Sequence, residues 1–451
     1  MFASTKTQVY KRETSIHMPE LHSDNILDEL GNALNDAMIS NVLTPYGPVP
    51  LANALESPDI GIVRPASIQL DALTKKIEPL LRNDKRFPGD DNYALLLETT
   101  RNGIYPNKSV EAMLYRAKKS GSTLDAIAWF LRVLAAKNGS AKLVETLWGL
   151  SIIEPLQLTE HIQLLPLDRL SESAQKAFFV PGANRGFKCS WTIPRIITDT
   201  PGGALVGQIE LKYCVHKYEP GQQQWSDLAE DQSVIAGLKN EFHDIAMLMT
   251  LVGSNPVIGT AIWMEYEDSD LKCYGDFLNY WSARSIENIP HSGQIYQPVD
   301  LSGIQEVIRD FQKLNDQAKL KIRVALERFN LALRRGNLGD RAIDLSIALE
   351  SLVGGNEPNE VTHKVTTRTA RLLGKDLIHR SRIRDIIKAT YTYRSAMVHN
   401  GQQPTKTKLV LNERTEAKEI LKQACIICAE LIKTILRQGN IPEWLDFDIA
   451  P

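Results

Sequence analysis

Arg394 and His399 lie five positions apart in residues 393–401, near the end of a 451-residue chain. Arginine holds a permanent positive charge that can bind a phosphate, and histidine can move a proton near neutral pH. His399 precedes the helix-stop pair Asn400-Gly401, and helix-end carbonyl groups favour a protonated imidazole. These groups could cleave RNA without a metal. An RNA 2′-hydroxyl would attack the adjacent phosphorus while side chains transfer protons and a cation stabilises the phosphorane.

The Arg-to-His spacing is not distinctive alone, because the chain repeats it elsewhere. Arg12 and His17 have the same separation, and Arg284 precedes His291 by a similar one. The first pair lies close to the N-terminus, and the second spans a proline, which interrupts a helix. Only the C-terminal pair falls in a segment with a helical pattern, so the argument depends on the elements around it.

The segment 382–399 is expected to form a helix with Ile383, Ile387 and Thr390 along one face. Helical spacing then places Arg394 on or beside this apolar stripe. A buried arginine needs a partner, which could be a carboxylate of the same domain or a phosphate at a protein–protein face. On a helix expected over 341–353, Glu350 is the favoured carboxylate, since Asp344 lies about 240° away around that helix.

The other elements suggest a mainly α protein with a mixed α+β middle region. Residues 1–179 are expected to be mostly helical, and 180–300 mix strands with a helix at 231–252 and could be sensing or regulatory. Residues 301–451 are nearly all helical. Helices are expected at 304–335 (one or a bent pair), 341–353 with Asp340 as N-cap, 361–373, 382–399 and 412–438. Short connections favour an antiparallel bundle.

The basic residues are concentrated in the C-terminal third. Residues 301–451 contain 25 Lys+Arg against 18 Asp+Glu, although the whole chain has a net charge of −2. Such an excess is compatible with a polyanionic partner or simply with a solvated helical face. If RNA is the partner, the residues expected to bind it are Arg368, Arg371, Arg384 and Lys388.

Four segments, 344–353, 368–374, 383–387 and 393–401, occur in an order that resembles the HEPN superfamily, and within it the ApeA-like HEPN domains. The resemblance covers about residues 300–440. It implies an antiparallel HEPN-like bundle of four or five helices. Many members are metal-independent endoribonucleases whose Arg-x4–6-His motif falls here on Arg394 and His399. Members commonly act as dimers with a composite site, and ApeA-like members are associated with prokaryotic anti-phage defence by abortive infection.

Further residues around the motif are expected to support the site. These are Glu350, Ser395 and Asn400, and Ser395 stands where many members carry Asn, Asp or His. The resemblance implies RNA and a second copy of the chain as partners, no cofactor and no metal. The alternative is a non-catalytic HEPN-like module that binds a protein or RNA partner, with Arg394 as a structural ion-pair residue.

Other chemistries have weaker support in the sequence. Cys425 and Cys428 lie in an apolar helix and are expected to pack in a core, and Cys189, Cys214, His216 and Cys273 lack the spacing of a zinc site. No glycine pair is followed by the Lys-Ser/Thr of a phosphate loop. The chain has neither a long apolar run nor an apolar N-terminal segment, so a cytoplasmic protein without a membrane partner is expected.

Overall fold

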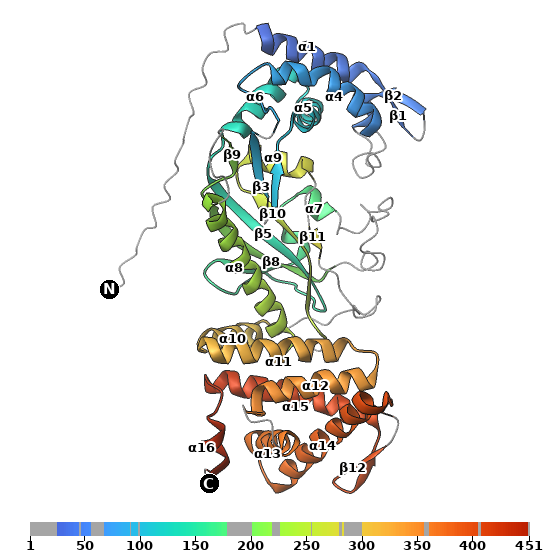
Figure 1. The fold of residues 1–451 in the computed structure, drawn as a ribbon, viewed down its shortest axis with the longest axis vertical. Helices are drawn as coiled ribbons and strands as arrows, with labels where there is room; N and C mark the ends of the chain where they lie inside the picture. The colour runs from blue at the N-terminus through green and yellow to red at the C-terminus, as the bar shows by residue number, and fades with distance from the viewer. Residues whose placement is uncertain are drawn as a thin grey trace, which may run out of the picture. The chain divides into compact units, whose positions relative to one another are not determined.

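The computed structural model describes residues 25–44, 47–55, 67–90, 92–97, 100–177, 201–218, 226–253, 255–278, 282–283, 300–355, 360–404 and 407–449 (Figure 1). The chain forms two compact units. Unit 1 comprises residues 1–90 and 105–131, and unit 2 comprises residues 91–104 and 132–451. Helices predominate in the described residues and strands form antiparallel sheets, so the expected mainly α class is confirmed at that level.

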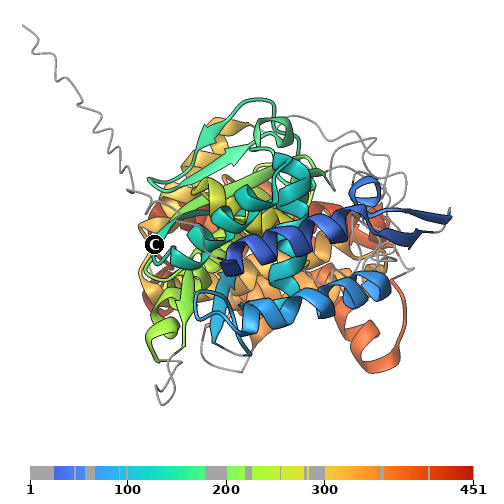
Figure 2. The ribbon, with the colours of Figure 1, turned by 90° about the horizontal axis from the view of Figure 1, so that it is seen from above.

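Unit 1 is helical with one small hairpin. Its elements are α1 (Asn25–Ile39), β1 (Asn41–Thr44), β2 (Gly47–Pro50), α2 (Leu51–Ala54), α4 (Ser67–Arg82), α5 (Pro106–Ser120) and most of α6 (Thr123–Ala135). Helices α1 and α4 lie side by side (Figure 2), and both contact α5. Leucines repeat along α1 at helical spacing and are buried, which explains why this segment is a helix.

Unit 2 contains, among its described residues, a six-stranded antiparallel sheet with the order β11-β10-β5-β8-β7-β6. The strands are β5 (Gly139–Trp148), β6 (Leu156–Gln157), β7 (Ile162–Leu165), β8 (Gly203–Leu211), β10 (Ile258–Tyr266) and β11 (Ser282–Ala283). A second sheet joins β4 (Thr100–Gly103), β3 (Tyr93–Leu97) and β9 (Val215–Lys217). Shorter elements are η1 (Leu167–Arg169), α7 (Ala174–Ala177) and α9 (Ser269–Leu278).

Helix α8 (Ser226–Met249) connects the six-stranded sheet to the helical bundle of unit 2. It packs beside β5, β8 and β10 (Figure 1), and Gly207 of β8 makes the close approach possible. A Cβ atom on Gly207 would lie 2.7 Å from a methyl group of Leu238. At the other side of α8, Asp244 accepts hydrogen bonds of 2.8–3.1 Å from Arg323 of the bundle. Helix α8 therefore packs against the sheet on one side and forms an ion pair with the bundle on the other.

The bundle consists of α10 (Leu301–Gln312), α11 (Asp316–Arg334), α12 (Leu338–Val353), α13 (Val361–Leu373), α14 (Leu377–Asn400), α15 (Ala417–Gln438) and α16 (Trp444–Ile449). Helix α12 is central, because it contacts α11, α13, α14 and α15. Its leucines at 345, 349 and 352 are almost completely buried. A helix with neighbours on several sides is held mainly by such packing.

The expectation of a mostly helical region over residues 1–179 misses part of the sheet. Residues 139–148 form strand β5, and β6 and β7 follow it within this range. Strand β5 lies between β8 and β10, and it buries Leu143 and Leu147 on one face and Val144 and Trp148 on the other, so its sequence lacks the alternation typical of a strand. The boundary at 179/180 cuts this sheet, since β5–β7 precede it and β8 follows. Residues 178–200 lie outside the described residues.

The bundle helices were placed well but several of their ends were not. Helix α12 begins at Leu338 because Asn337 is its N-cap and accepts hydrogen bonds from the N–H groups of residues 339 and 340, so Asp340 is not the cap. Helix α14 begins five residues before its expected start. Helix α15 begins later than expected, because a hairpin of β12 (Lys408–Val410) and β13 (Glu413–Thr415) precedes it. The segment 304–335 is two helices, α10 and α11.

Candidate active site

Helices α12 and α14 position the residues of the Arg-His motif. The carboxylate of Asp376 caps α14 by accepting a hydrogen bond of 2.8 Å from the backbone of His379. The helix ends at Gly401, whose left-handed φ of 61° favours glycine. Ile383, Ile386 and Ile387 bury one face of α14. The motif therefore occupies the last two turns of a well-capped helix.

Arg394 forms an ion pair with Glu350 of α12, which is the partner that the sequence favoured. Its Nη1 donates a hydrogen bond of 2.6 Å to Oε1 of Glu350, and the two side chains are 35% and 25% exposed. The guanidinium also lies over the ring of Tyr391, 5.7 Å from its centroid. Asp344 instead accepts hydrogen bonds from Arg328 and Arg335. Within the described part of the chain, Arg394 thus has one carboxylate partner, and about a third of its side chain is in contact with solvent.

His399 is exposed in the last turn of α14 and does not meet Arg394 within one chain. The two residues are separated by about 140° around the helix. The guanidinium lies against the side chain of Tyr391, three residues earlier, whereas His399 follows five residues later. Ser395 and Asn400 are exposed as well. The structure thus places both motif residues in contact with solvent but pointing to different sides.

The four basic residues expected to bind RNA fall into two groups. Arg384 and Lys388 are exposed on α14. They share one face of this helix with Ser395 and His399, because the successive separations along Arg384, Lys388, Ser395 and His399 are four, seven and four residues. Arg368 is buried on α13 and donates to Asp448 and to the carbonyl of Val353.

Arg371 is half-buried, donates to the backbone carbonyl of Asp448 and lies over the ring of Phe447. The expectation that Arg368 binds RNA is therefore not supported, because its guanidinium is enclosed by α16. Arg384 and Lys388 keep the exposure that a phosphate contact needs.

Two features of this region were missed from the sequence. Tyr391 is buried, and its hydroxyl has no hydrogen-bond partner among the described residues. Burial and the negative charge of Glu350 raise the pKa of Tyr391 above its ordinary value. The first turn of α12 also approaches α14, since a Cβ atom on Gly339 would lie 2.7 Å from the Met397 side chain. The sequence could have predicted the contact between Tyr391 and Arg394, because residues three apart on a helix are neighbours. It held no signal for the contact between Gly339 and Met397, which lie on different helices.

The remaining candidates agree with structural roles. Cys425 and Cys428 are buried in α15, and burial raises the pKa of the Cys425 thiol to about 11. Within the described residues, no group of three or more His, Cys, Asp or Glu side chains could hold a metal ion, and Cys189 lies outside them. In the same part of the chain, no helix combines the length and apolar character needed to span a membrane.

Comparison with protein-family models, with curated proteins and with solved structures gave no match for this chain. The functional argument therefore rests on the geometry of the bundle and on the residues of the motif.

Proposed function

We propose that this chain is a metal-independent endoribonuclease of the HEPN type and that it acts in prokaryotic anti-phage defence by abortive infection. In this proposal the C-terminal helices form the HEPN-like bundle. Arg394 binds the scissile phosphate and stabilises the phosphorane, and His399 transfers protons. Glu350 orients Arg394, while Arg384 and Lys388 bind the RNA backbone beside His399. No cofactor takes part.

The observation that carries the proposal is that Arg394 has N–H donors without a hydrogen-bond partner among the described residues. Its guanidinium has five N–H donors, and only Nη1 has a hydrogen-bond partner among the described residues. The Nε and Nη2 groups of this partly exposed side chain can therefore receive a phosphate without first breaking the ion pair. A guanidinium is well suited to this contact, since its donors match the geometry of phosphate oxygens.

The separation of Arg394 and His399 within one chain supports a site made by two copies. Cleavage needs a proton-transfer group and a cation at the same phosphate, whereas one chain holds its motif histidine and its motif arginine on different sides of α14. A two-fold interface places the same helix end of both copies face to face. Arg394 of one copy can then lie beside His399 of the other, which the helix geometry prevents within one chain.

The direct test is cleavage of a labelled single-stranded RNA in the presence of EDTA. We expect products with a 2′,3′-cyclic phosphate and a 5′-hydroxyl. Arg394→Ala and His399→Ala should each lower the rate by about 10² or more. Arg382→Ala and His363→Ala are matched controls, because both residues are exposed and lie outside the proposed site. The proposal would be contradicted if the control variants lost cleavage, or if the parent protein did not cleave RNA.

Coexpression of the two inactive variants tests the composite site. A dimer with one Arg394→Ala chain and one His399→Ala chain keeps one complete site if each site draws its arginine and its histidine from different chains. We expect partial recovery of cleavage in this mixed dimer and none in either variant alone. If both residues act within one chain, the mixed dimer stays inactive.

The second candidate is a non-catalytic module that binds a protein or RNA. The short hydrogen bond between Arg394 and Glu350 within one chain favours it, because such a pair can serve packing alone. In that case Arg394→Ala and His399→Ala leave the biological effect of the chain unchanged, and the parent protein leaves RNA intact.

A further inference from the structure

Two large aliphatic residues, Leu377 and Ile378, are exposed side by side at the start of α14. They are 80% and 70% exposed, although buried residues of their types form most of the bundle core. Both belong to unit 2 and follow the short connection between α13 and α14. Exposed apolar surface with a polar rim commonly marks an interaction site. No step of the proposed RNA cleavage uses these two residues.

The connection that presents this apolar pair is fixed by local contacts. The carboxylate of Asp376 caps α14 and accepts a hydrogen bond of 2.8 Å from the backbone N–H of His379. The Nε of Arg380 donates a hydrogen bond of 3.2 Å to the carbonyl of Gly374. No larger residue fits at 374, since a Cβ atom there would lie 2.2 Å from the side chain of Arg380. The turn is therefore preformed, which lowers the ordering cost of binding.

Cationic side chains accompany the apolar pair. Residues 375–388 contain five Lys and Arg against two Asp. One of these carboxylates caps α14, and the other, that of Asp385, accepts hydrogen bonds from Arg384 and from the backbone of Leu411. Lys375 is exposed, and its ammonium group has no ion-pair or hydrogen-bond partner among the described residues. The surface around the pair is therefore positively charged and attracts an anionic partner.

A lipid bilayer with anionic headgroups suits both properties of this surface. Its interface accepts bulky aliphatic side chains, and its headgroups attract Lys and Arg. RNA would use the cations, but RNA bases stack on aromatic rings and guanidinium planes and gain little from aliphatic side chains. A second copy of the chain would cover the apolar pair, but a two-fold contact would also bring the same cationic side chains together.

We propose that the start of α14 docks on the surface of a bilayer that contains anionic lipids. Leu377 and Ile378 insert at the level of the headgroups. Lys375 and Arg380 lie beside the lipid phosphates. The contact does not depend on the proposed nuclease activity, because Leu377 lies about 25 Å along α14 from Arg394. The expectation of no membrane partner came from the lack of a long apolar run, which bears on a spanning helix and not on a surface contact.

Cosedimentation of the full-length protein with lipid vesicles tests this surface. The vesicles consist of phosphatidylcholine alone or of phosphatidylcholine mixed with phosphatidylserine. We expect saturable binding to the mixed vesicles, and at least tenfold weaker binding to phosphatidylcholine alone. Replacing the pair, Leu377→Ser together with Ile378→Ser, should weaken binding to the mixed vesicles at least tenfold. Leu445→Ser is the matched control and should change binding less than twofold, because Leu445 is 73% exposed in the first turn of α16 but lies between Glu443 and Asp446.

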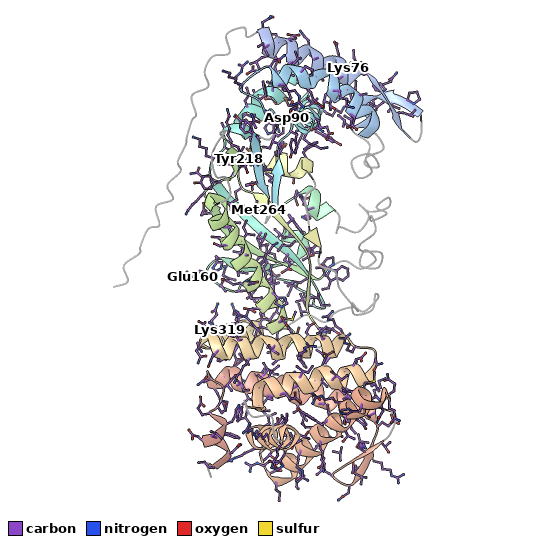
Figure 3. All side chains as sticks on the ribbon, viewed as in Figure 1. Lys76, Asp90, Glu160, Tyr218, Met264 and Lys319 are labelled. Atoms are coloured by element: carbon purple, nitrogen blue, oxygen red, sulfur yellow. The ribbon has the colours of Figure 1, made fainter. Side chains whose placement is uncertain are left out.

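A charge variant measures the electrostatic part of the contact. Lys375→Gln should weaken binding to the mixed vesicles about fivefold, since each lysine near an anionic surface adds to the attraction. Lys319→Gln is its control, because Lys319 belongs to α11, a different helix of the bundle (Figure 3). This control should change binding less than twofold.

The proposal is wrong if the protein does not bind the mixed vesicles, or if it binds phosphatidylcholine vesicles equally well. It is also wrong if the double variant binds as tightly as the parent, or if either control loses as much as the variant it matches. Loss of self-association or of RNA binding in a double variant that still binds vesicles would assign the surface to a second copy or to RNA. Circular dichroism checks folding. If the double variant is not folded, Leu377→Gln replaces it and must weaken vesicle binding at least threefold.

Discussion

Arg368 and Arg394 both pair with a carboxylate and lie over an aromatic ring, but the protein encloses the first and leaves the second partly open. Every guanidinium nitrogen of Arg368 has an acceptor, from Asp448 or Val353, and its side chain is 4% exposed over the ring of Trp444. Among the residues that the structure describes, Arg394 has one hydrogen bond, to Glu350, and its side chain is 35% exposed beside the ring of Tyr391.

The difference shows that an arginine's neighbourhood decides its role more than its sequence context does. Both residues belong to the basic C-terminal third, and the sequence predicted a role in RNA binding or cleavage for each of them. The side chain of Arg368 is almost completely buried and each of its three nitrogens donates to Asp448 or Val353, so it holds α16 against α13. Arg394 keeps unpaired donors in contact with solvent, as a phosphate-binding residue must.

The largest expected effect on stability is that of Arg368→Ala. Removing this buried guanidinium breaks its ion pair, its bond to Val353 and its contact with Trp444. We expect the free energy of unfolding to fall by about 3 kcal/mol. Urea denaturation measures it. A loss similar to that of Arg394→Ala would remove the distinction between the two arginines.

Asp448→Asn is expected to have a smaller and pH-dependent effect. The hydrogen bonds from Arg368 lower the pKa of Asp448 below its ordinary value of 3.8. A lowered pKa stabilises the folded state above the unfolded-state pKa, and this contribution is lost as the pH falls through the folded-state value. At about pH 7 the free energy of unfolding of the variant should be about 1 kcal/mol below that of the parent. The loss is no larger because Asp448 is partly exposed and solvent screens its charge. The stabilities of the two proteins, measured by denaturation, should approach each other as the pH falls below 3.8.

Arg394→Ala should change the free energy of unfolding by less than about 1 kcal/mol. Its ion pair with Glu350 is partly exposed, and such pairs contribute little once solvent screens them. The same variant should lose RNA cleavage under the proposed function. Strong destabilisation with no change in RNA cleavage would assign Arg394 to the same structural class as Arg368.

Tyr391→Phe is expected to have the smallest effect. The buried hydroxyl has no hydrogen-bond partner among the described residues, so its removal leaves no donor behind. We expect the free energy of unfolding to stay unchanged or to rise by at most about 1 kcal/mol. Thermal denaturation of the two proteins checks it. A clear loss of stability would mean that the hydroxyl donates a hydrogen bond to Glu350, the carboxylate that pairs with Arg394.

Local signals in the sequence predicted much of the bundle. Helix α13 was expected at the bounds that the structure gives, because Gly374 follows its last residue. Helical periodicity also selected Glu350 over Asp344 as the partner of Arg394. The hairpin β12–β13 was missed, since its turn uses Leu411 and Asn412 at positive φ and carries no glycine signal.

The sequence by itself determined most helices of the C-terminal third and their basic character, because these follow from spacing and composition within short segments. It favoured Glu350 over Asp344 as the partner of Arg394, but the pair itself joins helices 44 residues apart and depends on the fold. Tertiary structure decided that β5 is a strand, that Arg368 is enclosed and that the apolar pair at the start of α14 stays exposed. Each of these depends on segments far apart in the chain, such as Asp448, which lies 80 residues from Arg368. Periodicity reports which face of a helix is buried, but only the folded chain determines what covers it.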